Sequence, residues 1–365
     1  MVHQIGIIGA GFLTRHRLVQ LLSSTPGMRL AAVLDNRAET LRDIDSICPG
    51  ALLTCDEDEF FGTRLDMVHV ATPNSLHEHF ACRALEQGIA TVVEKPLAHT
   101  VASAERIAAA AARTGTPAIV GYMAKHNVYN QRARQLVAAG AIGVPLSMTA
   151  TRLGWRKDDW RSHRGSSGLG CLADLGIYPV LTAVDLFGAE PVRCEATAWP
   201  VADQEQTDTY AQATLWFDDR RYLHFETSAT FSEQPASAEV SMYTIVGDSG
   251  FIQVSGSWAM DGNGSLVLRN SAGWQDIELD PVNPYLAQYT LLAACSGGEP
   301  VPAAVSLQRG VADMKILYAI ADSAIRRAGT APAGTAPAGT VPAEPARPQD
   351  RPQDRPQARQ PVAVR

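Results

Sequence analysis

The sequence lacks the features that mark membrane and secreted proteins. No window approaches the roughly 18 uninterrupted apolar residues that a membrane span requires. The first residues also show no cationic segment followed by an apolar run and a cleavage site, as a secretory signal does. With 46% hydrophobic and 19% charged residues, the composition is typical of a water-soluble globular protein. We therefore expect a cytoplasmic protein that works away from the membrane.

Signals for metals and disulfides are missing as well. The six cysteines form no C-x-x-C pair, and the chain contains no H-E-x-x-H sequence. A disulfide framework, a zinc site and a zinc hydrolase are therefore all disfavoured, and we expect no metal.

Positive charge is too scarce for a nucleic-acid partner. The formal net charge is −7, and residues 331–365 contribute +2 through five Arg and three acids, which leaves −9 for the rest. An acidic body disfavours nucleic acid and agrees with a cationic substrate, although surface acidity more often serves solubility. These charges favour a small-molecule partner.

The first third of the chain predicts an α/β domain. Short β-branched runs alternate there with amphipathic stretches, a pattern typical of a parallel sheet with helices on both faces. The predicted strands are 4–8, 29–34, 67–71, 91–93 and 118–122, and the predicted helices are 13–22, 76–87 and 101–114.

After about residue 145, within a second predicted domain that spans residues 123–328, the pattern changes to longer alternating strands. They are predicted at 146–153, 207–217, 222–231, 241–247 and 251–254. This texture predicts an α+β domain with a large, mainly antiparallel open sheet. A helix beginning at Asp174 is expected before the sheet, and helices at 284–295 and 304–327 after it. Residues 329–365 are short Pro/Ala/Arg-rich repeats that cannot bury a core, so we expect a disordered tail.

A glycine loop follows the first predicted strand. Gly9 and Gly11 open a helix there, a context in which glycines let backbone amides approach a pyrophosphate and the helix N-terminus adds positive partial charge. Thr14 holds the third position of the pattern, so we expect helix and strand to lie slightly further apart than usual. The loop predicts a Rossmann dinucleotide-binding domain over residues 1–122, with Phe12 and Leu13 among its cofactor contacts.

The end of the second predicted strand indicates which dinucleotide binds. Asp35 ends the second strand, where an acid accepts hydrogen bonds from the adenosine ribose and repels a 2′-phosphate. Asn36 follows as a further candidate contact, and the neighbouring Arg37 would tolerate a phosphate. Asp35 nevertheless favours NAD over NADP.

The third strand also ends in cofactor candidates. Thr72, Pro73 and Asn74 lie at the carboxyl edge of the sheet, where ligands bind in such folds. Asn74 is a candidate contact to ribose or nicotinamide. His77 is a further cofactor candidate, with a structural role in the first helical turn as the alternative.

The fourth strand runs into Glu94-Lys95-Pro96. Together with the glycine loop, Thr72-Pro73-Asn74 and the Gly-rich sequence 168–178, this motif resembles the glucose-fructose oxidoreductase / inositol dehydrogenase / MocA family over residues 4–328. The resemblance implies an NAD(P)-dependent oxidoreductase acting on CH–OH groups. It also implies a homodimer or homotetramer that buries the outer face of the second-domain sheet.

The same resemblance assigns the catalytic residues. It implies that Lys95 lies beside nicotinamide and substrate, with Glu94 and Lys95 both among the cofactor contacts. Asp174 and Tyr178 stand four residues apart, a spacing that puts both on one face of a helix. Tyr178 is the candidate general acid/base, and Asp174 would orient the substrate hydroxyl or Lys95. Because a phenol with a pKa of about 10 is a weak base, we expect Lys95 and the cationic nicotinamide to lower the pKa of Tyr178.

The substrate side departs from the family pattern in two places. Leu169 replaces a usual glycine, and Lys125-His126 stand where the family often has Arg followed by an aromatic residue. Lys125 remains a substrate candidate. The segment 155–164 carries tryptophans suited to stacking on a sugar face, and it supplies the candidates Trp160, Arg161 and His163.

These residues predict hydride transfer between nicotinamide and a secondary ring alcohol of a sugar, aminosugar or cyclitol. A sugar-tailoring dehydrogenase of aminoglycoside biosynthesis agrees with the acidic body. A nucleotide-sugar ketoreductase, an inositol dehydrogenase and a non-catalytic dinucleotide-binding regulator remain open. The complete set of Lys95, Asp174 and Tyr178 counts against the regulator.

Overall fold

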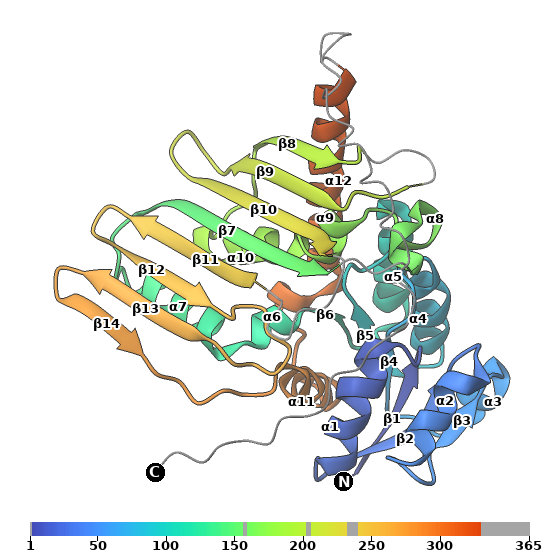
Figure 1. Ribbon diagram of the computed structural model, residues 1–365. Helices are drawn as coiled ribbons and strands as arrows, with labels where there is room; N and C mark the ends of the chain where they lie inside the picture. The colour runs from blue at the N-terminus through green and yellow to red at the C-terminus, as the bar shows by residue number, and fades with distance from the viewer. Residues whose placement is uncertain (1, 156–158, 202–205, 232–239, 330–365) are drawn as a thin grey trace, which may run out of the picture. The chain divides into compact units, whose positions relative to one another are not determined.

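The computed structural model describes residues 2–155, 159–201, 206–231 and 240–329. Residues 330–365, which are all but the first residue of the predicted tail 329–365, lie outside this range, as do residues 156–158 of the tryptophan segment. The described chain contains two sheets with helices packed on them (Figure 1).

The N-terminal sheet is parallel, with strand order β3-β2-β1-β4-β5-β6. Its strands are β1 (His3–Ile8), β2 (Met28–Leu34), β3 (Leu52–Thr54), β4 (Met67–Val70), β5 (Ala90–Glu94) and β6 (Ala118–Gly121). The helices are η1 (Thr14–Leu18, a π-helix), α1 (Val19–Ser24), α2 (Ala38–Asp45), α3 (Glu57–Gly62), η2 (Asn74–Leu76), α4 (His77–Glu86) and α5 (Val101–Thr114). The order reverses between β1 and β4, which is where dinucleotides bind in such sheets.

The α/β prediction for this part is confirmed. Each of the five predicted strands lies within one residue of an observed one. The short edge strand β3 and the helices α2 and α3 were not predicted. β3 spans three residues and only one of them is buried, which is too few to produce a visible alternation.

The second sheet has eight strands in the order β14-β13-β12-β11-β7-β10-β9-β8. They are β7 (Pro145–Trp155), β8 (Arg193–Trp199), β9 (Tyr210–Trp216), β10 (Tyr222–Phe231), β11 (Val240–Gly247), β12 (Gly250–Ser255), β13 (Ser265–Asn270) and β14 (Gly273–Ile277). β7 and β10 pair in parallel and all other neighbours antiparallel, which confirms the mainly antiparallel sheet.

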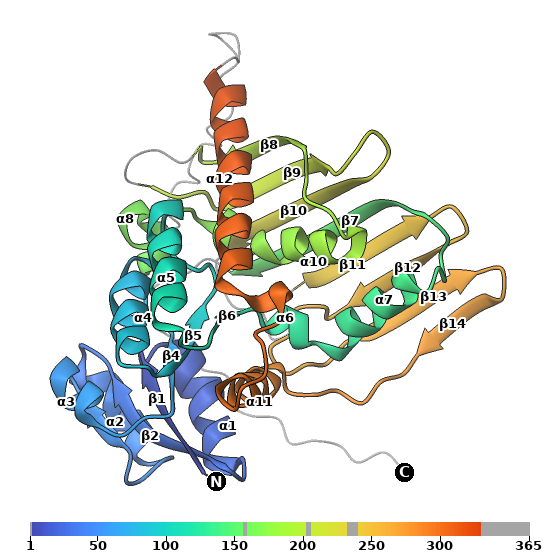
Figure 2. The same cartoon turned by 180° about the vertical axis from the view of Figure 1, so that it is seen from behind.

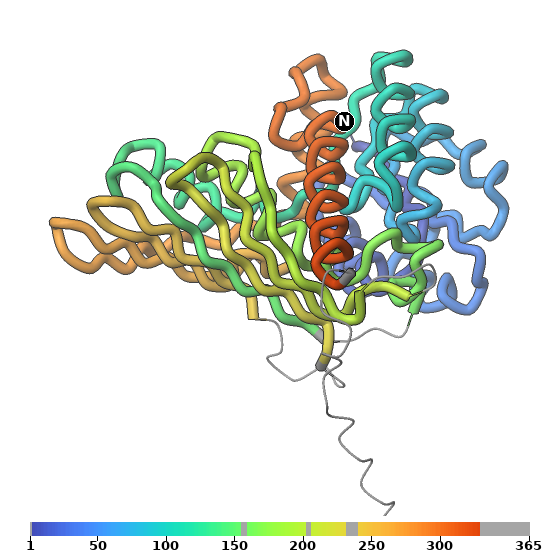
Figure 3. The backbone as a smooth tube through the Cα atoms, turned by 90° about the horizontal axis from the view of Figure 1, so that it is seen from above, coloured from blue at the N-terminus to red at the C-terminus, as the bar shows by residue number. Residues whose placement is uncertain are grey.

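Helices cover one face of this sheet (Figure 2). The helices that follow α5 along the described chain are α6 (Met123–His126), α7 (Val128–Ala138), η3 (Trp160–Ser162), α8 (Arg164–Ser167), α9 (Cys171–Asp174), α10 (Ile177–Phe187), α11 (Pro284–Ser296), η4 (Ala303–Val305) and α12 (Leu307–Gly329). α10 packs on β7 and β10, and α7 on β12 and β13. α12 lies between the two sheets and contacts α5 and β8 (Figure 3). This packing joins the two parts in one compact unit that ends at Gly329.

The prediction of a helix beginning at Asp174 is wrong. α9 ends at Asp174 and α10 begins at Ile177, and the two helical stretches are bent by 51°. Gly176 permits the bend, because a Cβ there would lie 2.6 Å from the carbonyl oxygen of Leu172. Asp174 and Tyr178 therefore do not share the face of one continuous helix.

The search for membrane-spanning helices in the described residues found one combination. No single helix is long and apolar enough to cross a membrane, and only the bent pair 164–174 with 177–187 passes by length and composition.

Candidate active site

The glycine loop leaves a cradle at the end of β1. Gly9 adopts a φ of +100°, and a Cβ there would lie 2.6 Å from the Ala71 carbonyl oxygen on the neighbouring strand end. A Cβ on Gly11 would meet no atom within 4 Å, so the loop faces open space. Thr14 is fully buried, and its hydroxyl donates to the Gly9 carbonyl at 2.5 Å. The loop thus has room for a bound pyrophosphate. The Thr14 hydroxyl holds the loop backbone in place through its hydrogen bond to Gly9.

Asp35 is held against this loop. Its Oδ2 accepts from the Ala10 N–H at 2.7 Å and its Oδ1 from the Arg37 N–H at 2.9 Å. Phe12 and Asn36 are exposed, and Leu13 is half-buried. Carboxylate and loop amides therefore stand together, an arrangement that suits the ribose and phosphates of a dinucleotide.

The residues after β4 make contacts within the protein. The Asn74 side chain is buried, and its Nδ2 donates to the Ser167 carbonyl at 2.9 Å. His77 is fully buried, with its ring nitrogens 3.0 to 3.2 Å from the carbonyls of Thr72, Pro96 and Leu97. Burial lowers the pKa of His77. Its position links the segments that follow β4 and β5, close to Pro73.

Lys95 is the centre of the candidate site. Its Nζ donates to the carbonyl oxygen of Asp174 and to Asp174 Oδ1, both at 2.7 Å. The peptide bond from Lys95 to Pro96 is cis. Burial on its own would lower the pKa of Lys95, but Asp174 and Tyr178 outweigh it and the net shift is upward. The side chain is therefore an ammonium at neutral pH and a hydrogen-bond donor.

Tyr178 stands in the first turn of α10, next to this ammonium. Lys95 Nζ lies 4.9 Å from the ring centroid, and the ring stacks on Trp258 at 5.9 Å. Burial raises the pKa of Tyr178, whereas Lys95 and Arg152 lower it, and burial prevails. Lys95 thus lowers this pKa as expected, but the net shift is upward, because the cost of burying a phenolate exceeds the stabilisation by the two cations. The phenol is protonated at neutral pH.

Arg152 is a site residue that sequence reasoning missed. Its side chain is 4% exposed, and its guanidinium lies 5.6 Å from the Tyr178 ring centroid. It occupies an inward position of β7, in phase with the buried Met148 and Ala150. A charged residue in the buried phase of a strand was the available signal, because such residues are almost never buried without a specific role.

Glu94 is held from behind by a buried pair. Its Oε1 lies 3.1 Å from His69 Nε2, and His69 Nδ1 lies 2.8 Å from the Tyr289 hydroxyl of α11. Gly121 leaves room for this carboxylate, since a Cβ there would stand 2.8 Å from Glu94 Oε1. Strands β4, β5 and β6 therefore all contribute to the place of Glu94.

The tryptophan segment reaches the site through one residue. Arg161 Nε lies 3.6 Å from Asp174 Oδ2, and its guanidinium lies 4.3 Å from the Trp160 ring centroid. His163 is exposed and forms an isolated bridge with Gln206. The structure thus brings Arg161 and Trp160 to the edge of the Lys95–Asp174 pair.

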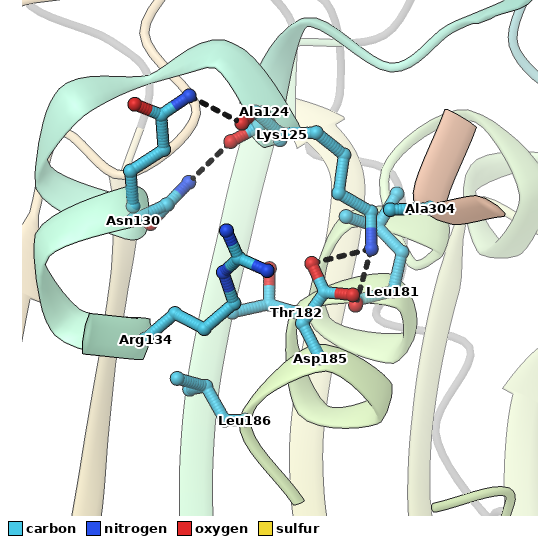
Figure 4. A pocket seen from close by; sticks show the side chains of 10 residues that line it. Ala124, Lys125, Asn130, Arg134, Leu181, Thr182, Asp185, Leu186 and Ala304 are labelled. Carbon is cyan, nitrogen blue, oxygen red and sulfur yellow. Dashed lines mark hydrogen bonds and ion pairs between the residues drawn. The ribbon is translucent and has the colours of Figure 1, made fainter. Parts of the chain in front are cut away.

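Lys125 lies apart from this group. It pairs with Asp185 and donates to the Leu181 carbonyl, in a pocket that Arg134 also lines (Figure 4). Burial lowers the pKa of Lys125, although Asp185 partly offsets the effect. The lining of this pocket includes neither Lys95, Asp174 nor Tyr178.

Within the described ranges, no group of three or more His, Cys, Asp or Glu side chains is arranged to hold a metal ion.

Comparison with known proteins gives matches along both sheets. The family model described as "Oxidoreductase family, NAD-binding Rossmann fold" matches residues 3–122, and the "GFO/IDH/MocA C-terminal domain" matches residues 130–253. D-xylose 1-dehydrogenase [NADP(+)] of Haloarcula marismortui is 23% identical over 87% of this chain and 89% of its own length.

Solved structures agree with this assignment. The aldose-aldose oxidoreductase from Caulobacter crescentus, solved with glycerol, superposes with a TM-score of 0.78 at 25% identity, covering 90% of this chain and 98% of that one. GenD2 from gentamicin A biosynthesis, in complex with NAD, has the same fold with a TM-score of 0.75 at 21% identity, covering 89% and 94%. With its Rossmann sheet, its open second sheet and these two matched domains, the chain belongs to the Gfo/Idh/MocA family of oxidoreductases.

Proposed function

We propose that the protein transfers a hydride between NAD and a secondary ring alcohol of a sugar, aminosugar or cyclitol. The observation that carries this proposal is the Lys95–Asp174 pair beside Tyr178, held at 2.7 Å at the carboxyl end of β5. Strand β1, which leads into the glycine loop, lies in the same sheet, separated from β5 by β4 alone.

The side chains divide the work around the alcohol carbon. When bound, the nicotinamide accepts or supplies the hydride. The Lys95 ammonium donates a hydrogen bond to the substrate oxygen and stabilises negative charge there, with Asp174 fixing its direction. Tyr178 accepts or donates the proton of the substrate hydroxyl. Its own phenol hydroxyl makes no hydrogen bond among the described residues. Because the pKa of Tyr178 is raised, the phenol suits proton donation to a ketone at neutral pH.

We propose NAD as the cofactor, with NADP the weaker ligand. Asp35 lies against the loop that would receive the adenosine ribose, and its charge repels a 2′-phosphate. The proposed cofactor contacts are Gly9, Gly11, Phe12, Leu13, Asp35, Asn36, Thr72, Pro73, Asn74, Glu94 and Lys95. For His77 the buried contacts favour a role in holding the cofactor loops over direct contact.

The substrate class rests on the relatives and on the charge of the site. Two of the named relatives act on aldoses, and a third, GenD2, belongs to gentamicin A biosynthesis. We propose Trp160, Arg161 and Arg152 as the substrate-facing residues, with His163 more peripheral and Lys125 in a separate pocket. A sugar-tailoring role in aminoglycoside biosynthesis is the specific form of the proposal that the acidic body favours.

Assembly and domain limits are also proposed. Helices α7 and α10 cover one face of the sheet, and the opposite face carries none of the labelled helices (Figure 1). Trp199 of β8 and Trp274 of β14 are exposed, and we place both on that opposite face. A second copy on that face would bury them in a homodimer or homotetramer, and we propose that this assembly works in the cytoplasm.

The proposed domains are residues 1–122 and 123–328, followed by a tail from 329.

The test is absorbance of reduced nicotinamide. The purified protein is mixed with NAD or NADP and with an aminoglycoside, D-xylose, levoglucosan, myo-inositol or a nucleotide sugar, alongside Tyr178→Phe. We expect one substrate class to reduce NAD, and we expect the rate of that reduction to fall about a hundredfold in Tyr178→Phe. Tight NAD binding without turnover in either direction would instead favour a non-catalytic regulator.

A further inference from the structure

A short segment before β9 crosses the Gly-rich loop, residues 168–170, which leads into α9 and Asp174. Asp208, two residues before β9, is 4% exposed. Its Oδ1 accepts from the Gly170 N–H at 3.0 Å and its Oδ2 from the Leu172 N–H at 2.8 Å. Its main-chain carbonyl accepts from the Cys171 N–H at 3.0 Å. One residue thus receives three consecutive backbone donors of the loop.

The space between the two segments is as restricted as their hydrogen bonding. A Cβ on Gly170 would lie 2.0 Å from the Asp208 carbonyl oxygen. The Cys171 Sγ lies 3.1 Å from Asp208 Oδ2, and burial together with Asp208 holds the pKa of that thiol well above its usual range. The neutral thiol therefore donates to the carboxylate as a fourth contact.

These donors are the free N–H groups at the start of α9. A helix leaves its first N–H groups without internal partners, and a helix of four residues cannot hold itself together. Asp208 supplies the missing acceptors from another part of the chain, as an N-cap residue does locally. α9 ends at Asp174, which in turn holds the Lys95 ammonium.

We propose that Asp208 is a positioning residue that sets the place of Asp174, and through it the direction of the Lys95 ammonium. This inference rests on the proposed function for its catalytic consequence. Asp208 itself touches neither Lys95 nor Tyr178; it acts through the backbone of α9.

The chemistry of the carboxylate defines the variant. Both oxygens accept from backbone N–H groups, and an amide offers one acceptor while its NH₂ faces the second donor. Asp208→Asn therefore breaks one of the two bonds at nearly constant volume. Asp218→Asn is the matched control, because Asp218 Oδ1 accepts from the Arg220 and Arg221 N–H groups at 2.8 and 2.7 Å at the other end of β9.

A second pair of variants separates the segments without altering Asp208. Gly170→Ala pushes a Cβ against the Asp208 carbonyl, whereas Gly165→Ala adds a Cβ in the nearby helix α8, at a place with no atom within 4 Å. Should Asp208→Asn fail to fold, this pair supplies the test.

Two readouts are measured for all four variants. One is kcat for the panel alcohol that the wild type oxidises, with NAD affinity by calorimetry. The other is the titration of Lys95 Nζ, followed by NMR of protein labelled with ¹⁵N-lysine. The chain has four lysines, so the spectrum contains few signals to assign. We expect kcat to fall by about thirtyfold in Asp208→Asn and Gly170→Ala with NAD affinity within about threefold, and Lys95 to titrate at lower pH than in the wild type.

The outcomes distinguish this inference from the proposed function. An unchanged Lys95 titration, or losses of kcat no larger than in the two controls, would overturn the positioning role while leaving the dehydrogenase intact. A wild type that turns over no alcohol would remove the proposed function, and the Lys95 titration would still decide whether Asp208 positions Asp174.

Discussion

The two sides of the candidate site are built differently. On the proposed cofactor side, the residues stand at or soon after the ends of parallel strands, as Gly9 follows β1, Asp35 follows β2 and Lys95 follows β5. On the substrate side, Arg152 lies within β7, Tyr178 in α10 and Trp258 after β12. The first arrangement comes from backbone geometry at one sheet edge, and the second from side chains that converge on one face. Motifs in a sequence report the first kind far better than the second.

The largest expected effect comes from Lys95, where the two sides meet. Lys95→Met removes the ammonium that Asp174 holds and that faces Tyr178, and kcat should fall by about a thousandfold. NAD affinity should fall far less than kcat, because Lys95 is only one of the proposed cofactor contacts and the glycine loop is untouched. Initial rates and calorimetry measure the two quantities. Lys315→Met is the control, since Lys315 is an exposed partner of Glu105; equal losses in both variants would contradict the assignment.

An intermediate effect is expected at Asp35, on the cofactor side alone. Asp35→Ser removes the charge that repels a 2′-phosphate, so the preference for NAD over NADP should drop by about tenfold or more. Steady-state rates with both dinucleotides and one alcohol measure the ratio. Asp43→Ser controls for a general loss of surface charge, since Asp43 pairs with Arg15 in the same domain. A ratio that stays unchanged in Asp35→Ser would mean that this carboxylate does not meet the ribose.

The smallest effect is expected at Arg152, on the substrate side alone. Oxidation requires Tyr178 to accept a proton, so its rate rises with pH toward the pKa of Tyr178, which burial raises and Arg152 lowers. Arg152→Met should raise this pKa further, move the acidic limb of the oxidation profile to higher pH, and slow oxidation at neutral pH by about threefold to tenfold.

Ketone reduction in the same variant should keep its rate at neutral pH, because the phenol is already protonated there. Arg193→Met removes an arginine that lies 3.6 Å over Trp216, and its pH profile should match the wild type. A profile for Arg152→Met that does not move would exclude an electrostatic role for this residue.

Much of the fold could be predicted because its determinants are local. Short β-branched runs between amphipathic stretches located the strands of the first sheet. Gly9 indicated a turn with a positive φ, which other residues rarely adopt. The short strand β3 and the bend between α9 and α10 were beyond this reasoning. β3 exists because β2 offers an edge, and the bend depends on the contact of Gly176 with Leu172.

The sequence by itself indicated the Rossmann sheet and the glycine loop, because both follow from backbone requirements at the ends of strands. Its motifs carried the resemblance to the family, and that resemblance proposed Lys95, Asp174 and Tyr178 as a catalytic set. The tertiary structure alone decided that Lys125 lies in another pocket, that Arg152 faces Tyr178, and that Asp208 holds α9. It also decided the direction of the pKa shift of Tyr178, because burial and the distances to cations depend on residues far apart in the chain.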